Sequence, residues 1–530
     1  MYGQDLIWSN DVYVDAMLSY NKEIKDFSVS ASAGWVGHTV KGETQKLWTR
    51  ATYFSYTDMN QLPTRINFFE PLASWGGSNM NEYSLSSNWD KGLFFTGQVG
   101  YKDYVYLEGS YRQDWYRAFK QFEYRGTPDN YGYFSVGANT LMHRYISLPE
   151  FITHLKLRAS YSEVGNSIPN EVFNKGKADL ATGAIASSTY GYFDNPIPET
   201  SKSFEAGFDV SFFDSSLNWD LTYYHTGLYN NYFLQATTGG KSKPVNTGLI
   251  RNQGIETTVS YSLGFAKDWM WRTSVNFSYN DNKIVKTFKD EQGKSSKLEQ
   301  KIAGGNIVVR YDEGGSYGDM YALDFRRNDD GSIYLSSNGA PQLSNNSYVY
   351  LGNMNSKFQL GWGNTISWKD LSLYFLVSGR IGGKVISLTE AYLDYQGVSK
   401  RVGDARLAAE ANPDLQWNGK PAMVMPDGNL APIEEYYKAV GGNMFGSQYV
   451  YDATNFRLAE LSLGYSFHNL FGGVISNLSL SVVGRNLFFI YKDAPVDPDI
   501  ALSTKNGLGA FDIFNMPATR SVGVNLKIDF

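Results

Sequence analysis

One pentapeptide in the sequence has the spacing of a hydrolase nucleophile. Gly314, Ser316 and Gly318 match the G-x-S-x-G elbow, which presents a serine on a sharp turn between a strand and a helix. Such a serine also needs an acid and a histidine, and His468 is the only histidine that follows it in the chain. The residues on both sides of the pentapeptide are polar, which is typical of a loop. We therefore predict a loop here and expect no enzymatic activity.

Residues of metal-ligating type are present, but their spacing does not indicate a metal centre. The five histidines are scattered and lack the H-E-x-x-H pairing of a zinc site: His38, His143, His154, His225 and His468. Asp493, Asp497 and Asp499 could offer oxygen ligands to a hard cation, but the two prolines between them favour an ordinary solvated turn. The absence of cysteine excludes thiolate sites and disulfides. We expect neither a metal ion nor a cofactor.

A third group of side chains could bind a solute. The long polar stretches carry six aromatic residues that are candidates for substrate binding: Trp75, Trp417, Tyr436, Tyr437, Tyr449 and Tyr451. Aromatic faces bind the apolar faces of sugars and of peptide side chains, and flat rings lose little entropy on binding. Packing within the loops would use the same residue types, so the sequence leaves both interpretations open.

The composition excludes several classes of protein. The chain has 530 residues, a formal net charge of −6 and no run of 18 apolar residues, which excludes membrane-spanning helices and argues against nucleic acid as a partner. Its first residues lack the basic region and apolar core of a secretory signal. The chain is nevertheless rich in aromatics, with 39 Tyr, 32 Phe and 12 Trp. A polar chain with so many aromatic residues calls for an unusual architecture.

Strict alternation of apolar and polar residues is the dominant pattern. Phe27, Val29 and Trp35 fall on one face of a strand, with serines on the other face, and the last residues before Phe530 alternate in the same way. No long segment shows clear helical periodicity. The alternation predicts about 15 strands, near residues 11–20, 26–37, 90–101, 104–117, 131–140, 153–165, 201–213, 216–235, 249–264, 268–282, 355–368, 371–383, 453–467, 477–490 and 517–530.

Strand length and connection length distinguish a soluble sandwich from a membrane barrel. The predicted strands run for about 9–14 residues, whereas soluble strands average about 5–6 and a tilted membrane-spanning strand needs about 9–11. Tight turns alternate with long polar stretches, near residues 38–89, 166–200, 283–354, 384–452 and 491–516. Short periplasmic turns and long extracellular loops are typical of outer-membrane barrels. We predict an all-β protein, a transmembrane antiparallel β-barrel.

Three further features fit a barrel. Aromatic residues such as Trp269 and Trp368 cluster near strand ends, where interfacial girdles are expected. Phe530 ends an alternating strand, as does the C-terminal aromatic residue that serves as an assembly signal in outer-membrane proteins. Charged residues on the polar faces of the strands would line a polar interior: Arg158, Glu205, Asp209, Arg272 and Arg485.

Several segments, in the same order, resemble the C-terminal part of the SusC/RagA-type TonB-dependent transporters of Bacteroidetes outer membranes. The similar segments are residues 100–114, 155–166, 198–205, 250–256, 351–358, 456–465, 484–487 and 496–498. The resemblance implies a barrel of about 22 strands with an N-terminal plug. Because about 15 strands and no plug or N-terminal extension are recognisable, residues 1–530 are predicted to form the C-terminal part of that barrel domain.

The resemblance also implies a function. It predicts TonB-dependent uptake of oligosaccharides or peptides across the outer membrane, together with a SusD-like surface lipoprotein. TonB–ExbB–ExbD would act through the missing N-terminal region, outer-membrane lipid and lipopolysaccharide would surround the barrel, and two such pairs could form a dimer. One alternative is an incomplete barrel that acts as a structural or interaction component of a multi-chain outer-membrane assembly, because its open edges would favour pairing. A soluble carbohydrate-active enzyme is a third hypothesis, but it lacks a convincing carboxylate pair.

Overall fold

The computed structural model describes residues 2–49, 80–120, 129–166, 197–236, 242–287, 289, 299–499, 509–516 and 518–530. The chain divides into two compact units. The first comprises Met1–Gly137 and Ser162–Thr200, and the second comprises Ala138–Tyr161 and Ser201–Phe530. The long strands pair in the order of the chain and form an antiparallel sheet of 15 strands. The all-β prediction and the predicted set of 15 strands are therefore confirmed.

Four long strands and most of a fifth belong to the first unit. They are β1 (Tyr2–Ile24), β2 (Phe27–Thr49), β3 (Met80–Tyr101), β4 (Val105–Tyr116) and β5 (Asn130–Leu141), with the short helix α1 (Arg117–Lys120) after β4. The first three pair in register over nearly their whole length. These three strands extend well beyond the alternating segments, because strand pairing continues through the polar residues that the sequence pattern assigned to a loop.

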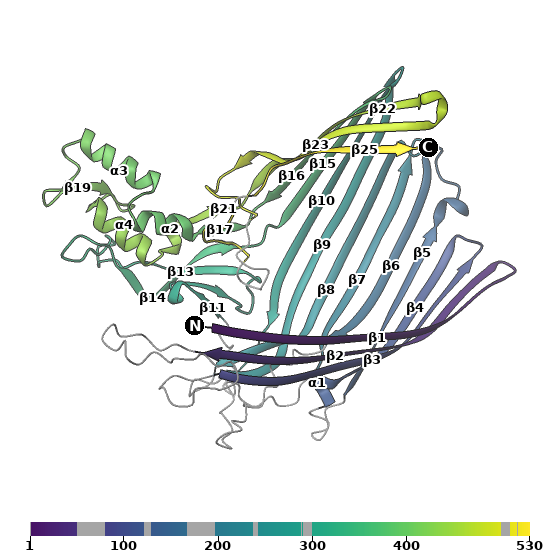
Figure 1. Cartoon of the computed structure of the whole chain (residues 1–530), viewed down its shortest axis with the longest axis horizontal. Helices are drawn as coiled ribbons and strands as arrows, with labels where there is room; N and C mark the ends of the chain where they lie inside the picture. Colours follow the sequence, from purple (N-terminus) through teal and green to yellow (C-terminus); the bar gives the residue numbers. More distant parts are fainter. Residues whose placement is uncertain are drawn as a thin grey trace. The chain divides into compact units, whose positions relative to one another are not determined.

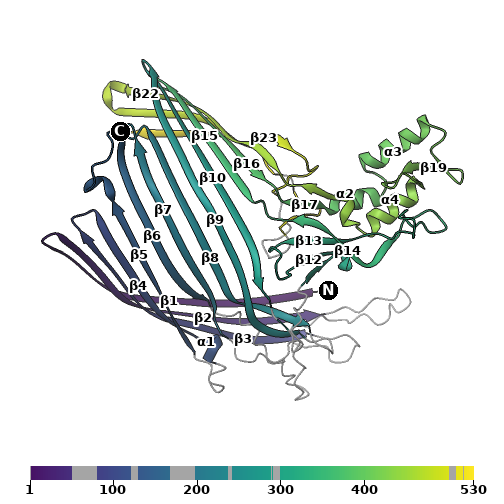
Figure 2. The same ribbon diagram turned by 180° about the vertical axis from the view of Figure 1, so that it is seen from behind.

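The second unit contains the other long strands. They are β6 (Ile152–Asn166), whose last residues cross into the first unit, β7 (Glu199–Phe212), β8 (Leu217–Ala236), β9 (Ser242–Ala266), β10 (Trp269–Lys286), β15 (Phe358–Trp368), β16 (Leu371–Ile381), β22 (Asn455–Leu470), β23 (Ile475–Lys492) and β25 (Ser521–Asp529). Strands β8, β9, β10, β15 and β16 lie side by side in both views (Figure 1, Figure 2).

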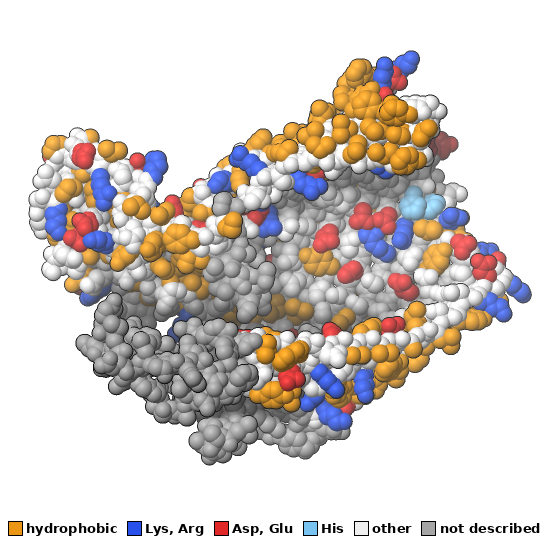
Figure 3. Space-filling view, viewed as in Figure 1, with side chains coloured by type: hydrophobic (Ala, Val, Ile, Leu, Met, Phe, Trp, Pro, Cys, Tyr) orange, Lys and Arg blue, Asp and Glu red, His pale blue; other side chains and the backbone are white. Residues whose placement is uncertain are grey.

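The apolar residues of these strands lie on an exposed face. In β25, Val522, Val524 and Leu526 are 76%, 66% and 59% exposed. Hydrophobic side chains gather over β22, β23 and β25 (Figure 3). Soluble monomers rarely expose contiguous apolar patches of more than a few hundred Å². An exposed apolar face on strands of this length matches the lipid-facing side of an outer-membrane barrel.

Short turns lie where the sequence predicted them. In the first unit a turn joins β3 to β4 at residues 102–104. In the second unit turns join the strands at one end, at residues 213–216, 267–268 and 369–370. Trp269 and Trp368 begin and end neighbouring strands at this end, and their rings stack with centroids 5.8 Å apart. The stacked pair belongs to the aromatic cluster that the sequence placed near the strand ends, where amphipathic rings meet the membrane interface.

The long connections at the other end of the second unit fold into a separate layer, which we call the connection module (299–354, 384–454 and 509–516). Its strands are β11 (Glu299–Ile302), β12 (Ile307–Arg310), β13 (Asp319–Phe325), β14 (Leu343–Asn353), β17 (Lys384–Ser387), β18 (Gln416–Trp417), β19 (Lys420–Val424), β20 (Leu430–Pro432), β21 (Val450–Asp452) and β24 (Phe511–Asp512). Three helices, α2 (Leu388–Tyr395), α3 (Lys400–Ala411) and α4 (Ile433–Gly442), complete it. None of the helices in the described ranges is long and apolar enough to cross a membrane.

The connection module has its own hydrophobic core. Ile307, Met320, Ile386, Phe445 and Phe511 are all fully buried in one cluster that draws on three separate connections. The side chains of Ser387 and Ser399 cap α2 and α3 by accepting hydrogen bonds from backbone amides. The sequence pattern described these stretches as long polar loops. They fold because apolar residues that are sparse in each stretch meet in one core.

The pH dependence of the module can be predicted from Asp427. Its carboxylate accepts hydrogen bonds from the backbone amides of Ile333, at 2.7 Å, and Asn429, at 3.1 Å. Burial opposes ionisation, but these hydrogen bonds outweigh it and lower the pKa of Asp427. A lowered pKa stabilises the fold at a pH above the usual aspartate value and loses that contribution as the pH falls.

We therefore expect Asp427→Asn to reduce the stability of the module by about 1 kcal/mol at pH 6, as is typical for one hydrogen-bonded group. The difference from the wild type should shrink as the pH falls through the lowered pKa of Asp427 and should be small at pH 2. Urea unfolding of the full chain at both pH values, followed by protease cleavage within the module, measures it. Asp329→Asn, on an exposed turn nearby, serves as control. A difference that is equal at both pH values would contradict the prediction.

Candidate functional site

Two rows of polar residues cross six neighbouring strands of the second unit. Strand register makes each member of a row the direct partner of the next. From β8 to β22 the first row is Asp220, Thr258, Asn276, Gly361, Ser378 and Arg457. The second row is Thr222, Glu256, Ser278, Gln359, Arg380 and Asn455. The rows are offset by two residues on every strand, so both lie on the same, polar face of the sheet.

The two rows line a cavity of about 530 Å³, which we call the row pocket. Carboxylates, amides, hydroxyls and guanidinium groups all reach it, and Gly361 in the middle of one row adds no side chain. Such a wall offers many hydrogen-bond donors and acceptors. It is suited to a solute that carries many hydroxyl, amide or charged groups.

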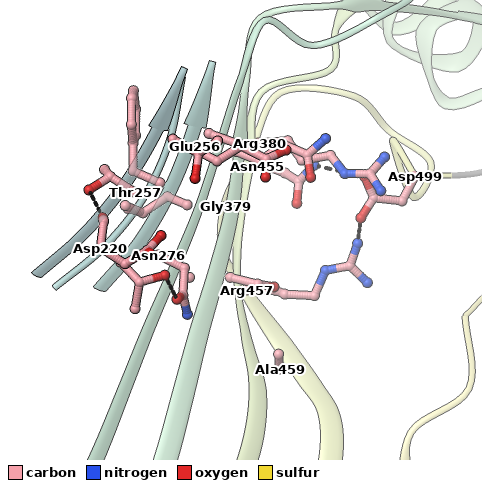
Figure 4. A pocket seen from close by; sticks show the side chains of 18 of the residues that line it. Asp220, Glu256, Thr257, Asn276, Gly379, Arg380, Asn455, Arg457, Ala459 and Asp499 are labelled. Carbon is pink, nitrogen blue, oxygen red and sulfur yellow. Dashed lines mark hydrogen bonds and ion pairs between the residues drawn. The ribbon is translucent and has the colours of Figure 1, made fainter. Parts of the chain in front are cut away.

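One end of the row pocket is formed by an ionic cluster (Figure 4). Arg380 on β16 and Arg457 on β22 both point toward Asp499, which comes from the segment that follows β23. Arg380 Nη1 lies 3.1 Å from Asp499 Oδ1, and Asn455 Nδ2 donates to the same oxygen at 3.3 Å. Arg457 Nη2 pairs with Asp499 Oδ2. The carboxylate is thus held by three donors from two strands.

A second ionic cluster lies at the other end of the rows. Arg158 on β6 bridges Asp209 on β7 and Asp220 on β8, with nitrogen–oxygen distances of 2.8 Å to each. Arg158 also donates to the hydroxyl of Thr222 at 2.6 Å. The sequence placed Arg158 and Asp209 on a polar face, and the structure brings them together. Arg485, from the same set, pairs with Glu460 at 3.1 Å outside the row pocket.

The candidate aromatic residues do not form one site. Tyr436, Tyr437 and Tyr449 are buried in the core of the connection module, and burial raises the pKa of all three hydroxyls. Their rings pack against the module core and present no open face to a solute. In this structure the three side chains pack within the module core, and their role in substrate binding stays an untested prediction.

The remaining candidates have different surroundings. Trp417 on β18 and Tyr451 on β21 are partly exposed, and the Tyr451 hydroxyl donates to Glu390. Trp75 lies outside the described residues. Phe530 follows β25 and is 87% exposed, and its role as an assembly signal stays a prediction.

The predicted loop around Ser316 is present. It joins β12 to β13, so a strand and not a helix follows the serine, and the setting of a nucleophile elbow does not form. The serine hydroxyl donates to Asn282 at 3.2 Å. Within the described residues no group of three or more His, Asp or Glu side chains is placed to hold a metal ion.

The segment of Asp493, Asp497 and Asp499 is not the ordinary solvated turn that its prolines suggested. The side chains of Asp497 and Asp499 are only 9% and 19% exposed, because both face Arg457. No spacing rule links Asp499 to Arg380 and Arg457, which are distant in sequence. The useful signal was the similarity of residues 496–498 to a segment of the transporter family.

Comparison with known proteins identifies the fold. Residues 4–378 match the family described as TonB dependent receptor-like, beta-barrel. The chain belongs to this family. Its apolar-faced strands thus form a TonB-dependent receptor-like β-barrel sheet of the outer membrane, as the alternation and the resemblance predicted.

Individual relatives of this TonB-dependent receptor-like chain are distant. It is similar to TonB-dependent receptor P39 of Formosa agariphila, with 24% identity over 98% of this chain and 53% of the relative. It is also similar to TonB-dependent receptor SusC of Bacteroides thetaiotaomicron, with 21% identity over 68% of this chain and 36% of SusC. The chain spans about half the length, or less, of the curated relatives it matches.

A solved structure shows the same fold. The RagAB peptide importer in the open-open state superposes with a TM-score of 0.73 at 17% identity, over 100% of this chain and 55% of that chain. Together with the similarity to SusC, this confirms the SusC/RagA-type resemblance that the ordered segments indicated.

Proposed function

We propose that this chain forms part of a SusC-like importer for oligosaccharides or peptides. In this proposal a SusD-like surface lipoprotein delivers the solute, and TonB with ExbB and ExbD supplies the energy. The row pocket carries the proposal, because it gathers hydrogen-bonding groups on the face of the sheet opposite the exposed apolar side chains. A membrane protein keeps such a face for water and polar solutes.

The relatives support the choice of solute and partner. SusC and P39 are named TonB-dependent receptors, and RagAB is described as a peptide importer. The chemistry of the row pocket is compatible with sugars as well as peptides, since hydroxyl and amide groups both need many donors and acceptors. Trp417 and Tyr451, the partly exposed candidates, are proposed to contact solute on the connection module.

Gene deletion in the native host tests the proposal. The deletion strain is grown on single oligosaccharides or peptides as sole carbon source, with the restored gene as control. We expect growth to be lost on the imported class and to be retained on monosaccharides and amino acids. Affinity purification of the tagged chain should recover a surface lipoprotein. Unchanged growth on every oligosaccharide and peptide would contradict import and favour a structural role in a multi-chain assembly.

A further inference from the structure

The ionic cluster around Asp499 is built as a complete carboxylate site. Oδ1 accepts from Arg380 and Asn455, and Oδ2 pairs with Arg457. Asn455 Nδ2 also donates to the backbone oxygen of Ala453, at 3.1 Å, and this hydrogen bond fixes the orientation of the amide toward Asp499. Arginine side chains are the preferred protein groups for binding carboxylates, because their planar forks match the two oxygens.

The carboxylate in this site comes from the segment of residues 495–499, which borders two cavities. Asp499 lines the row pocket, while Pro495, Val496 and Asp497 line a second cavity of about 510 Å³. Arg457 and Asn486 line both cavities. We call this segment the partition, because it borders both cavities, as Arg457 also does.

The two arginines lie on strands of the sheet, whereas the carboxylate of Asp499 lies on the partition. Arg380 and Arg457 are diagonal neighbours on the paired strands β16 and β22, where two like charges repel each other without an anion between them. The partition is attached in part by its own neighbour, because Lys492 Nζ contacts the backbone oxygens of Pro495 and Val496 at 3.1 and 3.2 Å. Arg380 is still 49% exposed on the pocket side and has donors beyond the one that Asp499 uses.

We propose that Arg380 and Arg457 bind a carboxylate of the incoming solute, and that Asp499 occupies this site as an internal substitute when solute is absent. A solute carboxylate that displaces Asp499 would release the partition and join the two cavities. The inference rests on the proposed import function and narrows its solute to one that carries a carboxylate. A uronic acid unit of an oligosaccharide and the C-terminus of a peptide share this chemistry.

Competition explains how the site would respond to mutation. Since the internal carboxylate occupies the arginines, a solute binds only to the fraction of molecules in which Asp499 has left. Asp499→Asn removes the carboxylate that pairs with both arginines and keeps the shape of the side chain, while Asp497, which lies 3.9 Å from Arg457, is present in both proteins. The variant should therefore bind carboxylate solutes more tightly, which is the opposite of what loss of an ordinary contact would do.

Binding to the purified full chain in detergent tests the proposal by calorimetry. One pair of probes is trialanine and trialanine amide, and the other is trigalacturonate and its methyl ester. We expect Asp499→Asn to bind one or both carboxylate probes at least about tenfold more tightly than the wild type, with the neutral probes unchanged. The probe pair that responds distinguishes a peptide from a uronic acid source. Asp499→Asn combined with Arg380→Gln should lose the gain.

Glu460→Gln provides the matched control. It removes the carboxylate of the ion pair between Glu460 on β22 and Arg485 on β23, and neither residue lines the row pocket. Gel mobility without heating verifies that each variant is folded. Equal affinity of the wild type and Asp499→Asn for both carboxylate probes would overturn the proposal, as would an equal gain for the neutral probes. The binding test is independent of uptake. If deletion abolishes growth but Asp499→Asn gains no affinity, the import proposal stands and the carboxylate site is rejected. If Asp499→Asn gains affinity but deletion leaves growth unchanged, only the import proposal is rejected.

Discussion

Replacing Arg401 with methionine is expected to destabilise the connection module by about 3 kcal/mol, the lower end of the cost of removing one partner from a buried ion pair, because Asp394 is buried while Arg401 is 35% exposed. Arg401 lies in the first turn of α3, and its Nη2 is 3.2 Å from Asp394 Oδ2 near the end of α2. The Asp394 side chain is fully buried, so the substitution would leave its charge without a counter-ion.

The surroundings of Arg401 explain why this one side chain has such a large effect. It also reaches Glu390 and the backbone oxygen of Gln448, both at 3.4 Å, and its guanidinium lies 4.9 Å from the centre of the Tyr449 ring. Tyr449 donates to Asp394 at 2.9 Å, and burial together with that carboxylate raises the pKa of Tyr449. Arg401 on α3 thus contacts α2 through Glu390 and Asp394, and it contacts the segment before β21 through Gln448.

Urea unfolding of the full chain, read by protease cleavage between residues 384 and 454, measures the effect. Lys400→Met is the matched control, because the adjacent Lys400 pairs with Asp404 on the exposed surface of the same helix. The control should unfold at the wild-type urea concentration, since exposed ion pairs contribute little. If Arg401→Met and Lys400→Met shift the midpoint equally, the buried pair does not hold the module together.

The second large effect is expected on the apolar face of the sheet. Val259 on β9 is 37% exposed and lies between its cross-strand partners Trp219 and Val275, which are also exposed. Arginine near the bilayer midplane on the lipid face of a barrel costs about 2–4 kcal/mol. Val259→Arg should therefore reduce the fraction of chain that folds into lipid bilayers and lower its unfolding midpoint in urea.

The adjacent residue supplies the control. Ser260 lies on the other face of the same strand, opposite Ser274 on β10, because successive side chains alternate. Ser260→Arg introduces the same charge on the polar face and should fold nearly as well as the wild type. Folding into bilayers, followed by the heat-dependent mobility of the folded form on gels, compares the two variants. Equal folding of Val259→Arg and Ser260→Arg would show that the apolar face does not contact lipid.

The fold of the sheet could be read from the sequence with little loss. Alternation has a period of two residues, which is the period of the strand itself. The pattern therefore predicts both where a strand lies and which residues fall on each of its faces. All 15 strands of the sheet were predicted, and the errors are in their ends, above all in β1, β2 and β3. Strand ends depend on pairing with a neighbour, which a single segment does not reveal.

The connection module was largely missed, for an equally physical reason. Helix α4 does carry a helical signal, since Ile433, Tyr436, Tyr437 and Val440 are all buried at the spacing of one helix face. Tyrosine is also a residue type that binds solutes, so Tyr436 and Tyr437 match both a helix face and a binding loop. In α3 the one buried residue is Val402, so no periodic face was available to read. The module core gathers residues from three connections, and no one of them contains enough apolar residues to indicate a core.

By itself, the sequence determined the all-β architecture, the apolar and polar faces, the family and the outer-membrane location, because all of these depend on local patterns or on ordered segments. Only the tertiary structure decided the row pocket and the cluster of Arg380, Arg457 and Asp499. The row pocket depends on strand register, in which residues far apart in the chain become direct partners. The ionic cluster depends on a connecting segment that returns to the sheet, and long-range charge pairing of that kind leaves no periodic pattern in a single sequence.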